Sequence, residues 1–133
     1  LLPMVVILFG KKLKGINKMK DFIFSDIKYQ LLNHLNSKKA ESLGKFVAPI
    51  ILENDVIISV QASEAHYCHP RINYGIWDSV EVFISPKYYR DVCSELLKYL
   101  EKEEKTMGFV PIDLVVSYII TSGGIKTYCE TEE

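Results

Sequence analysis

The chain has 133 residues, of which 48% are hydrophobic, and its 16 basic and 17 acidic side chains give a formal net charge of -1 at pH 7. This length predicts one domain of a soluble protein, and the near-neutral charge excludes wholesale binding of nucleic acid, which needs a strongly basic surface. The three cysteines show no pairing pattern, so we expect a reducing, cytoplasmic environment, and the sequence predicts no cofactor.

Residues 1–18 form a leader with two open interpretations. An apolar run of about ten residues is too short to span a bilayer, and Lys11, Lys12 and Lys14 follow it, whereas a signal peptide carries its charges first. No membrane partner is therefore predicted. In one interpretation the natural protein starts at Met19, because codons for Lys14 and Gly15 resemble a ribosome-binding site. In the other, the leader is an extra strand or a disordered tail, and residues 19–133 form the domain in both.

The first element is a helix predicted over residues 21–36. Ile27, Leu31 and Leu35 fall on one apolar stripe, and Ser25 is a suitable N-cap. His34 lies beside this stripe, where we expect a boundary histidine without chemistry. Residues 45–52 then form a strand, which is either an edge strand or broken at Pro49, because proline cannot donate to a ladder.

Two further strands follow, over residues 56–62 and 79–84, since apolar and polar residues alternate in both. Ser85 and Pro86 start a helix that is expected to run to about residue 102, with Cys93 buried on its apolar stripe and a solvated segment at 101–105. A helix from residue 110 to the 120s ends at Gly123 and Gly124. Residues 125–129 add a last short strand before the acidic tail 130–133, which we expect to be disordered.

The order of these elements predicts an α+β fold, in which a small antiparallel sheet arranged as a meander is packed by two to three helices.

The fifteen residues from 63 to 77, between two predicted strands, show no alternation of apolar and polar side chains. Hairpin loops usually have about two to five residues, so a loop this long and this polar is more typical of binding than of turning. Tyr67, Tyr74 and Trp77 offer flat faces for a ring, and Arg71 offers a planar fork for a phosphate or carboxylate. Together they predict noncovalent recognition of a small nucleotide-like ligand, with these ligand-binding residues: Gln61, Ser63, His66, Tyr67, Arg71, Asn73, Tyr74 and Trp77.

Three alternatives stay open for this loop. His66, Cys68 and His69 are metal-ligand types at short spacing, although no second ligand pair accompanies them. The same residues supply the types for cysteine–histidine catalysis, without a nucleophile elbow. The third alternative is a loop whose aromatic side chains pack and whose polar groups face water. No catalytic or metal-binding residue is assigned.

Four segments of the chain resemble small proteins of phages and prophages: VQASEAHYCHPR at 60–71, DSVEV at 78–82, GFVPIDLVV at 108–116 and SGGI at 122–125. The resemblance extends to the phage anti-Thoeris sponge proteins. Those proteins are oligomers, with pockets built partly between subunits, and they sequester a cyclic ADP-ribose isomer made by bacterial TIR-domain proteins upon infection. The resemblance implies a noncatalytic sponge acting in the cytoplasm of the infected host.

Two rival functions accompany this prediction. One is a protein-binding inhibitor module that uses the loop 63–77 as an aromatic epitope. The other is a small hydrolase that depends on Cys68 and its histidines or on a metal. We also expect a homo-oligomer, with the strand at Pro49 and the region of Phe22 and Phe24 as candidate contacts.

Overall fold

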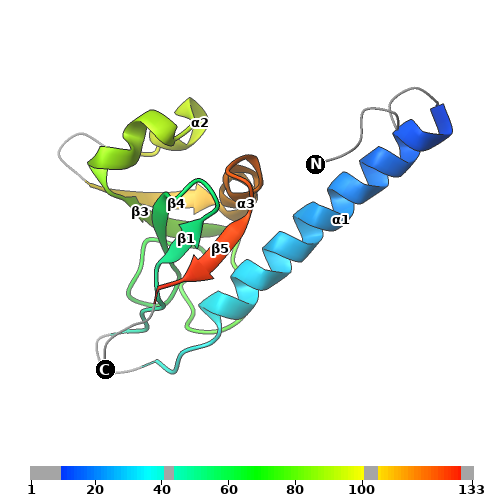
Figure 1. Ribbon diagram of the computed structural model, residues 1–133. Coiled ribbons are helices and arrows are strands. Elements are labelled where there is room, and N and C mark those ends of the chain that lie inside the picture. The colour runs from blue at the N-terminus through cyan, green and yellow to red at the C-terminus, as the bar shows by residue number, and fades with distance from the viewer. Residues whose placement is uncertain (1–9, 41–43, 101–104, 130–133) are drawn as a thin grey trace.

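The computed structural model describes residues 10–40, 44–100 and 105–129. Its elements in chain order are α1 (Gly10–Leu35), β1 (Ile50–Leu52), β2 (Ile57–Gln61), β3 (Ser79–Ile84), the 3-10 helix η2 (Pro86–Asp91), α2 (Ser94–Leu97), β4 (Thr106–Pro111), α3 (Ile112–Thr121) and β5 (Ile125–Tyr128). Figure 1 shows α1 as a long helix whose first half extends beyond the sheet and α3.

All five strands form one antiparallel sheet in the order β4-β3-β2-β1-β5. The first four strands are a meander, and β5 returns along β1. This arrangement confirms the predicted α+β fold with a small antiparallel sheet packed against helices. Of the two interpretations of residues 45–52, the break at Pro49 is confirmed, because β1 begins only after this residue, at Ile50. The edge strand is wrong, because β1 lies between β2 and β5.

The core lies between one face of the sheet and the helices α1 and α3. Alternation along the strands places Ile58 and Val60 of β2, and Val80, Val82 and Ile84 of β3, in this core. The helices contribute their own buried stripes, Leu31 and Leu35 from α1 and Val115, Val116 and Ile119 from α3. The opposite face of the sheet, called here the outer face, carries Ile57 and Phe83, which are partly exposed.

Helix boundaries depart from the sequence prediction at two places. The first helix begins at Gly10 instead of residue 21, so residues 10–18 of the leader belong to α1, while residues 1–9 lie outside the described residues. The helix predicted over 86–102 is instead η2 and the four-residue α2, separated by extended backbone at Val92 and Cys93. Cys93 is only half-buried.

Strand β4 is the element that the sequence analysis missed. It lies directly before α3, and Pro111, its last residue, is the N-cap of that helix. The predicted end of α3 is confirmed, because Gly123 and Gly124 take positive φ values of 96° and 104° and donate to the carbonyl oxygens of Ile120 and Ile119.

Predictions for residues 101–104 and 130–133 fall outside the described residues. Within the described ranges, no helix combines the length and the apolar character that crossing a membrane requires.

Candidate functional site

The loop between β2 and β3 is built on its own hydrogen bonds. The Asn73 amide accepts from the Glu64 backbone N–H at 3.1 Å and donates to the Glu64 carboxylate at 2.8 Å. A second clamp comes from the residue directly after α1, Asn36, whose side chain exchanges two hydrogen bonds with the backbone of Gly75, at 2.9 and 3.0 Å. Because both sides of the loop are fixed, a ligand would meet a largely preorganised surface.

Gln61 and Ser63 lie beneath this surface. Both are buried, and the Gln61 amide exchanges hydrogen bonds of 2.9 and 2.8 Å with the backbone N–H and carbonyl of Val47. The Ser63 hydroxyl accepts from the Ala65 N–H at 3.1 Å and lies 2.6 Å from Nδ1 of His66. The structure therefore places these two polar groups in support of the loop, away from solvent.

His66 is buried behind Ser63, and the ring of Phe46 contacts it edge-on with centroids 4.8 Å apart. Burial lowers the pKa of His66, and the nearby Glu81 carboxylate opposes this shift only in part. The Ser63 hydroxyl is thus the partner of one ring nitrogen, Nδ1. The other ring nitrogen, Nε2, is buried and has no partner among the described residues.

Trp77 belongs to the core, with 1% of its surface exposed and its indole N–H donating to the Ile72 carbonyl at 3.2 Å. The structure therefore removes its face from the predicted stacking surface. Lys45 is buried beside it, with Nζ 5.2 Å from the Trp77 ring and 4.3 Å from the Tyr74 ring, and it donates to the Asn73 carbonyl. Burial lowers the pKa of Lys45.

Tyr67, Arg71 and Phe109 form an exposed cluster, called here the rim. The Arg71 guanidinium carbon lies 5.2 Å from the centroid of the Tyr67 ring, and Arg71 Nε donates to the His66 carbonyl at 3.0 Å. The Tyr67 and Phe109 ring centroids are 5.9 Å apart, and these side chains are 57% and 51% exposed. The rim thus presents two aromatic rings and one cation to solvent.

Strand β4 gives the rim its third member. The Phe109 N–H donates to the Tyr67 carbonyl at 3.0 Å. Gly108 allows this approach, because a Cβ atom at that position would lie 3.1 Å from the Tyr67 Cβ. Phe109 itself has a φ of 53°, a left-handed conformation that is unusual for a bulky residue. Sequence analysis missed Phe109 because it missed β4, although an aromatic residue next to Gly108 was an available signal.

The remaining predicted aromatic residue lies in a different contact. Tyr74 is about half exposed, and its hydroxyl accepts from the backbone N–H of Ala40 at 2.6 Å. Its ring covers Lys45, whereas Tyr67 contacts Arg71 and Phe109. The structure therefore brings together Tyr67 and Arg71 of the predicted set and places Tyr74 in a separate contact.

The residues of the metal and cysteine hypotheses lie in unlike environments. Cys68 is buried, its thiol donates to the Ser63 carbonyl at 3.2 Å, and burial raises its pKa, which disfavours the nucleophilic thiolate. His69 is exposed and pairs with Asp78 at 3.2 Å. Among the described residues, no group of three or more His, Cys, Asp and Glu side chains is placed to hold a metal ion.

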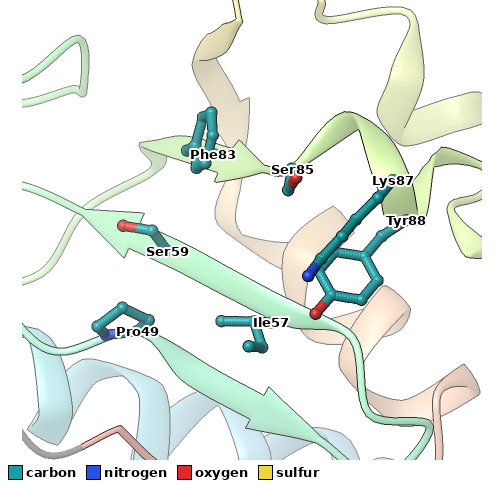
Figure 2. Close-up of a pocket in the computed structure, with 7 residues that line it drawn as sticks. All are labelled: Pro49, Ile57, Ser59, Phe83, Ser85, Lys87 and Tyr88. Carbon is teal, nitrogen blue, oxygen red and sulfur yellow. The ribbon is translucent and has the colours of Figure 1, made fainter.

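A groove on the outer face of the sheet was not predicted from the sequence. It has a volume of about 250 Å³ and is lined by Pro49, Ile57, Ser59, Phe83, Ser85, Lys87 and Tyr88. Figure 2 shows Lys87 and Tyr88 reaching from η2 toward β2, while Ser59 and Phe83 lie on the neighbouring strands β2 and β3. The lining side chains are mainly apolar, and Lys87 is the cation among them. Lys87 Nζ lies 5.0 Å from the centroid of the Tyr88 ring.

Comparisons with protein-family models, with curated proteins and with solved structures give no match for this chain. The resemblance to phage sponge proteins therefore stays a prediction. The side chains of the rim, the loop and the groove are the basis for a functional assignment.

Proposed function

We propose that the protein is a noncatalytic binding protein for a small nucleotide-like anion, which it holds at the rim. The observation that carries this proposal is the position of Arg71 over the Tyr67 ring, 5.2 Å away. The hydrogen bond of Arg71 to the His66 carbonyl uses only Nε, and its terminal nitrogens have no hydrogen-bond partner among the described residues. A planar guanidinium of this kind binds a phosphate or carboxylate through two parallel hydrogen bonds.

The rings of Tyr67 and Phe109 provide the second half of the recognition. Both are about half exposed, and stacking of a base on an aromatic side chain contributes roughly 1–3 kcal/mol. Because the clamps at Asn36 and Asn73 hold the loop beneath them, little conformational entropy is lost when the ligand binds.

Sequestration without chemistry fits the surroundings of the rim. The Ser63 hydroxyl and the Cys68 thiol are buried, so a ligand on the rim contacts neither of these groups. Within this proposal the ligand belongs to the cyclic ADP-ribose isomer class, and the protein is a phage-type anti-defence sponge in the bacterial cytoplasm, as the resemblance implies.

Thermal melting with a panel of cyclic nucleotides and ADP-ribose isomers tests the proposal. A ligand at about one hundred times its dissociation constant stabilises the fold by about 2.7 kcal/mol, which is an easily measured shift. We expect Arg71→Ala and Tyr67→Ala to remove the shift. The matched control is Arg90→Ala, which removes an exposed arginine of η2 and should leave the shift intact.

Two results contradict the proposal. A shift of equal size in Arg71→Ala places the ligand elsewhere, and recovery of a cleaved ligand after denaturation makes the protein an enzyme. Recovery of the unchanged ligand supports sequestration.

A second candidate function is a protein-binding inhibitor module, which the partly exposed Ile57 and Phe83 and the adjoining groove favour. Exposed apolar surface of this kind is typical of protein interaction sites. This function predicts that a host protein co-purifies with the wild type and is lost with Phe83→Asp, while no panel member changes the melting temperature. A nucleotide shift that Phe83→Asp retains favours the rim instead.

A further inference from the structure

Helix α1 carries an apolar stripe that faces away from the core. Met19, Phe22 and Tyr29 are 47%, 72% and 65% exposed. Their spacing of three and seven residues places them on one side of a helix with about 3.6 residues per turn. The buried Leu31 and Leu35 lie on the other side, where α1 packs against the body. In Figure 1 the first half of α1 extends beyond α3 and the sheet.

Two charges flank the centre of this stripe. Lys18 and Asp26 are both exposed and lie four residues before and four residues after Phe22. If a second copy of the helix were to pair in parallel register, Lys18 would face Lys18 and Asp26 would face Asp26, and both contacts are repulsive. In an antiparallel pair centred on Phe22, each Lys18 faces an Asp26 of the other copy, so the two-fold axis creates two attractive contacts.

We propose that the stripe of Met19, Phe22 and Tyr29 is the surface through which two copies of this chain pair by antiparallel α1 helices, with the two-fold axis beside Phe22. The two Phe22 rings then meet at the axis. Position 29 lies opposite position 15 of the other copy, and this residue is Gly15, which has no side chain to obstruct the Tyr29 ring. The proposal refines the predicted contact at Phe22 and Phe24, since Phe24 is half-buried against the core of its own chain.

The exposed surface sets the expected strength of this pairing. An aromatic side chain buries roughly 150–250 Å² when fully covered, while a standard interface buries about 800 Å² on each partner. Two aromatic residues and one methionine provide only part of that area. We therefore expect a dimer that dissociates on dilution, not a permanent one.

Sedimentation equilibrium of the full chain over a range of concentrations and salt tests this pairing. The wild type should be a dimer whose dissociation constant rises with salt. Phe22→Asp should raise that dissociation constant by roughly thirtyfold or more, because it removes both of the Phe22 rings that meet at the two-fold axis. The matched control is Ile76→Asp, which introduces the same charge at a loop residue that is also 72% exposed and should remain dimeric.

A charge exchange tests the antiparallel arrangement independently of folding defects. Lys18→Asp or Asp26→Lys alone should weaken the dimer by about tenfold, because each replaces two attractions with two repulsions. The double variant should recover wild-type affinity. A wild type that is monomeric at every concentration, a dimer that Phe22→Asp leaves intact, or a double variant weaker than both single variants overturns the proposal. A monomer that binds anionic lipid vesicles through Phe22 would assign the stripe to a membrane surface instead.

Discussion

The loop 63–77 and the exposed stripe of α1 use their side chains in opposite ways. In the loop, the hydrogen-bonding groups of Ser63 and Asn73 bond to neighbouring parts of the chain. Along α1, Phe22 and Tyr29 remain exposed. The difference has a backbone cause, because a helix satisfies its own N–H and C=O groups, whereas an irregular loop needs side chains to do so. Polar composition therefore marks a loop that must stabilise itself before it can bind anything.

The largest expected difference between the two regions is in stability. Trp77→Ala should lower the free energy of unfolding by about 3–5 kcal/mol, because it opens a cavity in the core. Phe22→Ala should change it by less than about 0.5 kcal/mol in dilute protein, where the exposed ring has no partner. Urea unfolding of both variants measures the contrast, and similar losses would show that Phe22 packs within its own chain.

A smaller contrast is expected between two glutamines. Gln61→Ala removes two hydrogen bonds from the buried backbone of Val47 and should cost about 2 kcal/mol. Gln30→Ala removes a 2.9 Å bond to Asp26 on the surface of α1 and should cost about 0.3 kcal/mol. Urea unfolding distinguishes these values, and equal losses would contradict the view that the buried hydrogen bonds beneath the loop stabilise the fold more than those on the surface of α1.

The smallest expected effect is a dependence of stability on pH. Burial lowers the pKa of His34 and of His66 from the ordinary value of 6.5. The hydrogen bond to the Ala48 carbonyl opposes this shift at His34, and the Glu81 carboxylate opposes it at His66. The unfolded chain therefore binds more protons below this value, so the free energy of unfolding should fall as the pH decreases below about 6.5.

Urea unfolding at a series of pH values measures this dependence. His34→Gln should reduce the slope, since it removes one of the two titrating groups while keeping a donor for the Ala48 carbonyl. Gln30→Ala, which carries no titrating group, should keep the wild-type slope. An unchanged slope in His34→Gln would exclude His34 as a source of the effect.

Much of the fold was predictable from local pattern. Alternation predicted β2 and β3, and the two glycines predicted the end of α3, and the structure contains all three features. The failures occurred where local signals were weak or mixed. Strand β4 contains a glycine and a residue with positive φ, and the predicted helix after Ser85 is interrupted by extended backbone at Val92 and Cys93.

The candidate site was predictable only in part. Tyr67 and Arg71 are neighbours in the sequence and meet in the structure, whereas Phe109 joins them from a strand more than thirty residues away. In the sequence, Trp77 is as suitable for stacking as Tyr67, but in the structure its side chain is buried in the core. A sequence pattern reports which chemical groups are present and not which side of the chain they occupy once a loop has folded.

The sequence by itself determined the α+β class, the meander and the concentration of polar and aromatic residues between β2 and β3, because these follow from periodicity and composition along the chain. Only the tertiary structure decided that β5 pairs with β1, that Gln61 bonds to Val47 and that Tyr67, Arg71 and Phe109 share one surface. Such contacts join residues far apart in sequence. They form because buried polar groups must find partners and apolar groups must leave water, and both requirements are met only when the whole chain has folded.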